Sequence, residues 1–280
     1  MSFGPTPWQQ TNWDWRAAGN FVCGGAGAGL IVFAALCGAQ GLTLTALLLG
    51  GMALVGAGLL CVWLELGRPL RSLHVFFNPR TSWMTREAFC ATLLMPVALA
   101  AAIGLPGFKW LAAALALAFL YCQSRMLQAA KGIPAWREPL AVPLVVLTGL
   151  AEGGGLWLIA QAAVAAEHPL LLALVGALVL ARVLVWRAYR RRVAASAVPP
   201  ALAALDAAGR PLLIAGSALA LLALAFGAVV GGALAPLLLF AAGLLAAATG
   251  SWFKFTLVTR AGFNQGFALT HLPVRGVRRG

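Results

Sequence analysis

Charged residues are scarce in this sequence, which excludes a soluble globular protein of this size. Only 10% of the 280 residues are charged, 62% are hydrophobic, and the mean hydropathy is +0.91. So little polar surface cannot cover a soluble domain, and apolar stretches long enough to cross a bilayer recur along the chain. The sequence therefore predicts an all-α polytopic membrane protein. Residues 1–280 are expected to form a single integral membrane domain, with a short polar segment at 1–16 and a basic tail at 260–280.

Histidine and paired cysteine are also lacking, which argues against a redox group or a metal in this chain. A haem between helices needs axial ligands, usually histidine, at membrane depth. His74, His168 and His271 are all expected in loops or in the tail. None of the five cysteines forms a CxxC pair, and no set of His, Cys, Asp and Glu has metal-ligand spacing. We therefore expect no haem, no iron–sulfur cluster and no bound metal.

Acidic residues are few, so the chain has a net charge of +13. Nearly all the basic residues fall at 68–86, 125–137, 182–210 and 260–279, at helix ends and in short loops. Membrane topology explains this distribution better than nucleic-acid binding. By the positive-inside rule, these segments and both termini are expected to be cytoplasmic; the expected location is a bacterial inner membrane. A basic face would also serve to dock an acidic partner, and charge alone does not separate the two readings.

The expected architecture is an antiparallel bundle of about eight transmembrane helices. Turns at Gly41, Pro106-Gly107, His168-Pro169 and Gly231-Gly232 are short enough to join neighbouring helices into hairpins. Glycine and alanine within the helices favour close packing. The predicted helices cover 17–39, 43–66, 86–105, 109–130, 139–165, 169–188, 211–231 and 234–259.

One polar loop, 64–87 (LELGRPLRSLHVFFNPRTSWMTRE), lies between two of these apolar helices. It has a carboxylate at each end, Glu65 and Glu87, with arginines between them. Both acids are expected at the membrane interface, where each is also explained as a helix-end charge; Glu87, in the first turn of its predicted helix, also complements the helix dipole. Gln123 and Arg125 are expected to close the helix at 109–130 in the same way, by reaching the interface.

Glu152 is the ionisable residue predicted deepest in the membrane, and three glycines follow it. Charged groups at that depth are costly and mark either a functional pathway or a paired structural site. Glu152 is therefore either a proton-relay or quinone-pocket carboxylate, or else a carboxyl kept neutral or paired with Arg182 on the next helix. Lys254 is expected to close the last helix at the interface.

Three features together resemble a known family. They are the loop at 64–87, the motif GIPAWREPLAVP at 132–143, and an eight-helix plan without histidine ligands. The chain resembles the DmsC-like anchors, the membrane subunits of dimethyl sulfoxide reductase-type molybdenum enzymes, and more distantly the polysulfide-reductase and NrfD anchors. The LG-x-P step at 66–69 and Glu87 carry most of the likeness. The segments at 9–21 and 260–276 resemble a subgroup labelled as phenylacetyl-CoA:acceptor oxidoreductase subunits.

The resemblance implies a heterotrimer. A catalytic subunit would hold molybdopterin, a ferredoxin-like subunit would hold iron–sulfur clusters, and this anchor would bind a quinone, menaquinone or ubiquinone, beside the nearest cluster. In the family, the positions matching Glu87 and Glu65 belong to the quinol region. The second position is a histidine in the enterobacterial dimethyl sulfoxide reductase anchor and a glutamate here, which leaves its proton handling open. Glu152 has no family counterpart.

A chain without its own electron carrier would act by bringing a quinone close to a partner's cluster. Such a site needs hydrogen-bond partners and a proton path, because quinone chemistry moves two electrons and two protons. Basic side chains would dock the iron–sulfur subunit electrostatically. The residues predicted for quinone binding and proton exchange are Glu65, Arg68, His74, Trp83, Arg86, Glu87, Tyr121, Arg125 and Glu152; those predicted for docking are Arg71, Arg80, Lys131 and Arg137.

Two other functions stay open from the sequence. A transporter or proton-translocating protein would use Glu152 and Arg182 as a midplane relay, although the broken helices and inverted repeats that favour this class are not evident. A purely structural anchor would tether its partners and bind no quinone.

Overall fold

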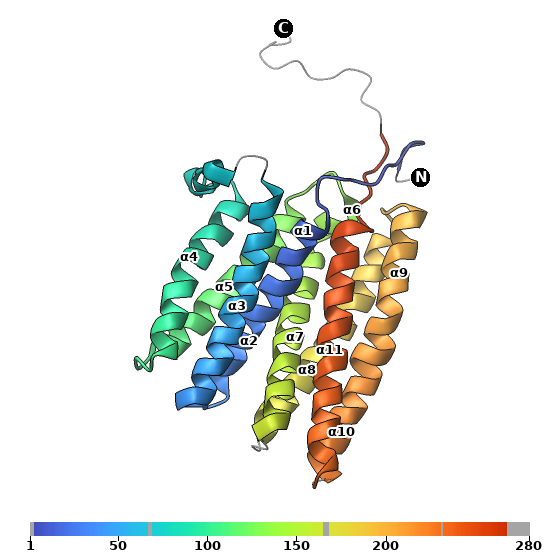
Figure 1. The fold of residues 1–280 in the computed structure, drawn as a ribbon. Coiled ribbons are helices and arrows are strands. Elements are labelled where there is room, and N and C mark those ends of the chain that lie inside the picture. The colour runs from blue at the N-terminus through green and yellow to red at the C-terminus, as the bar shows by residue number, and fades with distance from the viewer. Residues whose placement is uncertain (1–2, 67–68, 165–167, 231, 268–280) are drawn as a thin grey trace.

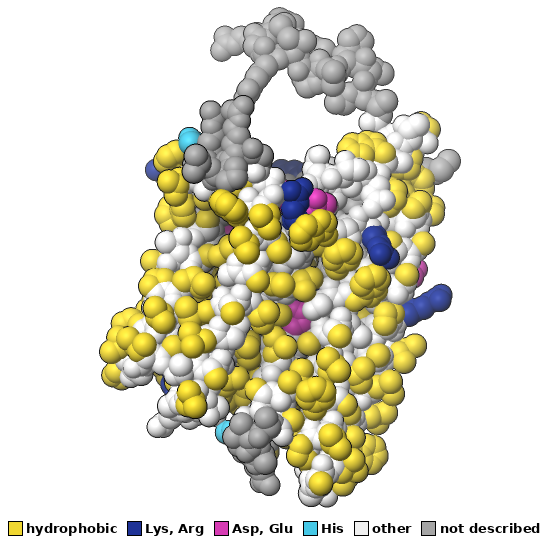
Figure 2. All heavy atoms as spheres, in the orientation of Figure 1, with side chains coloured by type: hydrophobic (Ala, Val, Ile, Leu, Met, Phe, Trp, Pro, Cys, Tyr) yellow, Lys and Arg dark blue, Asp and Glu magenta, His cyan; other side chains and the backbone are white. Residues whose placement is uncertain are grey.

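The computed structural model describes residues 3–66, 69–164, 168–230 and 232–267, and over these residues the protein is a helical bundle without strands (Figure 1). Eight helices in the described part are long and apolar enough to cross a membrane. Hydrophobic side chains cover most of the visible flank of the molecule (Figure 2). The predicted all-α polytopic architecture is confirmed.

Two of the eight spans contain a π-helical turn. The first span consists of α1 (Trp15–Gly19), the π-helical turn η1 (Asn20–Gly24) and α2 (Gly25–Leu36); the seventh consists of α9 (Pro199–Leu213), the π-helical turn η3 (Ile214–Leu219) and α10 (Ala220–Val230). The other spans are α3 (Gly41–Glu65), α4 (Trp83–Ala102), α5 (Phe108–Gln128), α7 (Ala141–Val164), α8 (Pro169–Val193) and α11 (Leu234–Thr259). A 3-10 helix, η2 (Pro69–Phe77), and the short α6 (Pro134–Arg137) lie between spans.

The sixth and seventh spans are longer than predicted. The sequence predicted a basic loop from the end of the helix at 169–188 to residue 211, but α8 runs to Val193 and α9 begins at Pro199. The charges in this segment were expected in a cytoplasmic loop. Instead, Arg190 pairs with Asp206 at 2.6 Å and joins α8 to α9. Proline at the first position of α9 suits a helix start, because its missing N–H has no partner there in any case.

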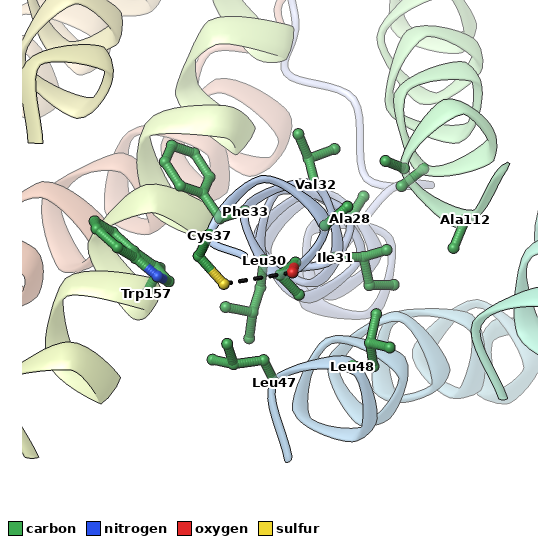
Figure 3. Packing of buried hydrophobic residues seen from close by; sticks show 14 of the residues in the cluster. Ala28, Leu30, Ile31, Val32, Phe33, Cys37, Leu47, Leu48, Ala112 and Trp157 are labelled. Atoms are coloured by element: carbon green, nitrogen blue, oxygen red, sulfur yellow. Dashed lines mark hydrogen bonds between the residues drawn. The ribbon is translucent and has the colours of Figure 1, made fainter. Parts of the chain in front are cut away.

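The centre of the bundle is the contact between α2 and α7. Almost every residue of α2 is buried, and Figure 3 shows Leu47 and Leu48 of α3 beside it. Phe33 of α2 stacks on Trp157 of α7 with ring centroids 5.8 Å apart. A Cβ added at Gly29 would lie only 3.0 Å from the Cα of Gly153. The two helices therefore touch through bare backbone, as small residues allow in membranes.

The described ends of the chain meet at one end of the bundle (Figure 1). Gln10 N–H donates to the Gly262 carbonyl at 2.8 Å, and Gly4 N–H donates to the Gln265 carbonyl at 2.7 Å. We call this the basic end; it includes segments 3–14, 69–82, 129–140, 194–198 and 260–267. Its placement on the cytoplasmic side stays a prediction from the charge distribution.

We expect Gly153→Ala to destabilise the protein by about 1–3 kcal/mol, the usual result of overpacking a close contact. The new methyl would meet the Gly29 backbone, which cannot move away as a flexible side chain can. Gly176→Ala is the matched control, because its Cβ would find its nearest neighbour at 3.5 Å, an ordinary contact. Thermal unfolding in detergent measures both; equal midpoints for the two variants would contradict the close approach.

Topology reporters test the cytoplasmic assignment. A fluorescent protein fused after the C-terminal tail should fluoresce, because fluorescent proteins fold in the cytoplasm. A phosphatase inserted at Gly104, at the opposite end of the bundle, should be active, because that end is expected outside the cytoplasm. The reciprocal fusions are the controls. A reversed pattern would put the basic end outside and remove the positive-inside explanation for the charge distribution.

Candidate functional site

A cavity of about 320 Å³ opens near the basic end, between the first span, α3, α4 and α5. It brings together Glu65 from the end of α3 and Glu87 from the start of α4, the two carboxylates that bound the polar loop in the sequence. We call it the carboxylate cavity. Its lining residues are Trp13, Ala17, Asn20, Phe21, Val62, Glu65, Leu66, Met84, Glu87 and Met126.

Glu87 is buried rather than interfacial. Its exposure is only 4%, because α4 begins at Trp83 and the first span and α5 pack over the second turn. Two amides converge on Oε1: Asn20 Nδ2 donates at 2.9 Å and Gln123 Nε2 lies at 3.5 Å. Gln123 Nε2 also donates to the Asn20 carbonyl at 2.9 Å. A carboxyl held by amides in an apolar wall is fixed in position while keeping its second oxygen available for proton exchange.

Glu65 is half-buried at the end of α3, next to Arg16. Arg16 Nη1 donates to the Leu64 carbonyl at 2.9 Å, while its Nε and Nη2 hold the two oxygens of Asp14. Asp14 also caps α1 by accepting from the Arg16 N–H at 2.8 Å. The Arg16 guanidinium hydrogen-bonded to Asp14 lowers the pKa of that carboxyl. The cavity thus has one buried acid, Glu87, and one at its edge, Glu65.

Trp13 closes the cavity from the N-terminal segment. Its ring stacks on Trp136 with centroids 5.0 Å apart and lies 6.0 Å from Phe21. Trp136 Nε1 donates to the Leu257 carbonyl at 2.8 Å, so the wall of the cavity is tied to α11. The contacts between the described N- and C-terminal segments at the basic end therefore help to position Trp13 at the cavity.

Four residues predicted for the same site form a separate cluster on the surface. The guanidinium carbons of Arg86 and Arg125 lie 4.2 and 4.6 Å from the centroid of the Trp83 ring. Tyr121 accepts a hydrogen bond from Arg125 Nη1 at 2.9 Å. None of the four lines the carboxylate cavity. Trp83 and Arg125 instead line a second, more open hollow of about 810 Å³, together with Lys131 and Arg137.

The remaining predicted residues lie at the basic end or outside the described chain. His74, in η2, packs edge-on against Phe77 with centroids 5.2 Å apart. Arg80 is exposed, and its carbonyl accepts from Arg86. Arg68 lies outside the described residues, and the side chain of Arg71 is not described.

Glu152 pairs with Lys254, not with Arg182. Lys254 Nζ lies 2.5 Å from Glu152 Oε2, and both side chains are buried. The prediction that Lys254 reaches the interface was wrong: it lies more than one turn before the end of α11 and faces α7 and the first span. Its ammonium also donates to the carbonyls of Phe21 at 2.5 Å and Val22 at 3.4 Å.

Arg182 is fully buried near this pair and is held by backbone carbonyls. Its Nη2 donates to Gly216 at 2.6 Å and its Nη1 to Ala246 at 3.2 Å. Carbonyl oxygens are acceptors that the membrane does not otherwise supply, so they satisfy charges that would be costly in hydrocarbon.

Each π-helical turn supplies carbonyl acceptors to one of the two cations, Lys254 and Arg182. A π-helical turn widens the helix and frees carbonyl groups from the regular hydrogen-bond ladder. Phe21 and Val22 belong to η1 and accept from Lys254, while Gly216 belongs to η3 and accepts from Arg182. The interruptions in the first and seventh spans thus coincide with the two buried cations.

Sequence reasoning missed three of these residues. Asn20 was not singled out, Gln123 was assigned to the interface, and Lys254 was treated as a helix-end charge. Two of them had a signal: Asn20 is a lone amide entering an apolar stretch, and Lys254 is followed by a further apolar turn before α11 ends. The signal does not name the partner, because the contacts join segments more than 100 residues apart.

Among the described residues, no group of three His, Cys, Asp or Glu side chains is placed to hold a metal ion. No protein-family model matches the chain, and no curated protein matches it. A proposal for the function must therefore rest on the arrangement of residues around the carboxylate cavity. It is a cavity with apolar walls, two acids able to take up or release protons, and an amide network that fixes one of them.

We expect Lys254→Met to destabilise the protein by about 3–5 kcal/mol, because it leaves Glu152 as an unpaired buried charge. Combining it with Glu152→Gln should recover most of that loss, since the double variant buries no lone charge. Lys109→Met, at the opposite end, is the control and should change little. Thermal unfolding in detergent measures all three; a double variant no more stable than Lys254→Met would contradict the pairing.

Proposed function

We propose that the protein is the membrane anchor of a molybdopterin oxidoreductase complex and binds a quinone or quinol in the carboxylate cavity. The observation that carries the proposal is the presence of Glu65 and Glu87 in one cavity of about 320 Å³. That volume lies within the range of small-molecule sites, and mostly apolar walls with a few polar groups are typical of them.

The residues of the cavity suit proton-coupled quinone chemistry. A bound quinone supplies the two-electron step, with electrons passing to or from an iron–sulfur cluster of a partner subunit. Glu87 takes up or returns the proton, and Asn20 keeps its carboxylate in place. Glu65, half-exposed at the edge, exchanges protons with water at the basic end. General acid–base groups must lie within hydrogen-bond reach of the reacting oxygen, and both carboxylates line the cavity that the quinone would enter.

The basic end suits the docking of the partner. Of the residues predicted for docking, Arg71 and Arg80 lie at this end in segment 69–82, whereas Lys131 and Arg137 line the hollow beside Trp83. A ferredoxin-like subunit with an acidic face would be steered to this surface. The heterotrimer with a molybdopterin subunit is part of the same proposal.

The two rival functions have weaker support. A transporter that uses Glu152 and Arg182 needs groups free to change partners, whereas Glu152 is ion-paired and Arg182 is held by two carbonyls. A tether without quinone leaves the two acids of the cavity unexplained. Co-purification separates the classes: molybdenum, iron and quinone favour the proposal, metals without quinone favour the tether, and a lone polypeptide favours transport.

We expect Glu87→Gln to lower quinone-linked turnover of the intact complex by about 10²-fold or more, the usual contribution of a general acid or base. Glutamine keeps an oxygen that accepts from Asn20 but cannot exchange a proton, so the fold should survive. Glu138→Gln, which changes a carboxylate paired with Arg192 outside the cavity, is the control. Unchanged turnover and unchanged inhibitor affinity in Glu87→Gln would remove this residue from the site.

A further inference from the structure

The hollow beside Trp83 has a charge that the protein itself does not balance. Arg125, Lys131 and Arg137 line it, and none of them takes part in an ion pair of the described residues. The one carboxylate in the lining, Glu138, lies 3.5 Å from Arg192 and pairs with it. The hollow therefore presents positive charge to whatever enters it.

Arg125 has donor capacity left over. Its Nη1 binds the Tyr121 hydroxyl, and its Nε is buried with no hydrogen-bond partner among the described residues. The guanidinium is held over the Trp83 ring, which also carries Arg86. Both guanidinium groups lie close to one ring, so positive charge is concentrated beside the hollow.

The hollow lies where a lipid headgroup would lie. With 21 residues, α5 is about 31 Å long, which matches a hydrocarbon core of about 30 Å. Arg125 is in its last turn, and Trp83 begins α4 next to it. Tryptophan and tyrosine at such positions are typical of the membrane–water interface.

An exposed stripe on α5 leads from the hydrocarbon to this arginine. Leu117 and Tyr121 are each 42% exposed and precede Arg125 at spacings of eight and four residues, so all three share one helix face. Trp110 and Ala114 continue the face toward the other end of the helix. Acyl chains lying along this stripe would place a phosphate at Arg125.

We propose that the hollow formed by Trp83, Arg125, Lys131 and Arg137 binds the phosphate of an anionic glycerophospholipid, whose acyl chains lie along the exposed face of α5. Arginine binds phosphate oxygens with two parallel hydrogen bonds, and basic hollows between helices on the cytoplasmic side bind anionic lipids. The assignment does not rest on the proposed quinone function, because the hollow is separate from the carboxylate cavity.

Native mass spectrometry of the full chain, titrated with phosphatidylglycerol or phosphatidylcholine, tests the site. The wild type should retain phosphatidylglycerol in preference to phosphatidylcholine. Arg125→Gln and Lys131→Gln should each raise the half-saturating concentration of phosphatidylglycerol about fivefold, the effect of removing one cation near the surface. Arg125→Lys keeps the charge but not the two parallel hydrogen bonds, so it should lose less affinity than Arg125→Gln, which separates a lost charge from a misfolded variant.

Arg260→Gln is the matched control. Arg260 lies 4.8 Å from the Trp252 centroid at the same end of the bundle, but it does not line the hollow, so retention should change little. An equal loss in Arg260→Gln would reduce the effect to general attraction by interfacial arginines and overturn the proposal.

Two further results would also overturn it. Displacement of the lipid by excess inorganic phosphate would identify a site for free phosphate. Loss of an acidic protein partner from the complex in Arg125→Gln, with lipid retention unchanged, would identify a protein-docking surface. Quinone-linked turnover of Glu87→Gln is independent of all these outcomes, so the failure of either proposal can be told from the failure of the other.

Discussion

The ion pair between Lys254 and Glu152 is the constraint around which the centre of the bundle is arranged. It joins α11 to α7, and through the carbonyls of η1 it also joins both to the first span. Hydrocarbon cannot solvate either charge, so the protein must supply every partner. The π-helical turn in the first span supplies two carbonyls to Lys254, and η3 supplies one to Arg182. Irregular helix geometry here follows from the need to satisfy buried cations.

The same π-helical turn links the centre to the carboxylate cavity. Asn20 is its first residue and holds Glu87, while Phe21 follows it and accepts from Lys254. Gln123 of α5 bridges the Asn20 carbonyl and Glu87. Two adjacent residues of one helical turn thus contact the buried ion pair and the proposed quinone site. This arrangement explains why the first span, rather than the polar loop at 64–87, organises the site.

The basic end combines surfaces with different chemistry. The carboxylate cavity is small, apolar and acidic, whereas the hollow beside Trp83 is open and basic. From the sequence, Glu65, Glu87, Trp83 and Arg125 were assigned to one site, because they lie in one loop and the helices next to it. The structure divides them by helix face, since Glu87 and Arg86 are adjacent in sequence but lie about 100° apart around α4. One faces the bundle and the other the interface.

The sequence by itself determined the fold class, the eight spans and the basic end, because hydropathy and charge act locally and need no knowledge of partners. It also placed Glu65 and Glu87 at the two ends of one loop. Only the tertiary structure decided which helix faces meet, and thus that Asn20 and Gln123 hold Glu87, and that Glu152 pairs with Lys254 rather than Arg182. Such pairings depend on the rotation of each helix, and hydrophobic periodicity is too weak to fix it where nearly every residue is apolar.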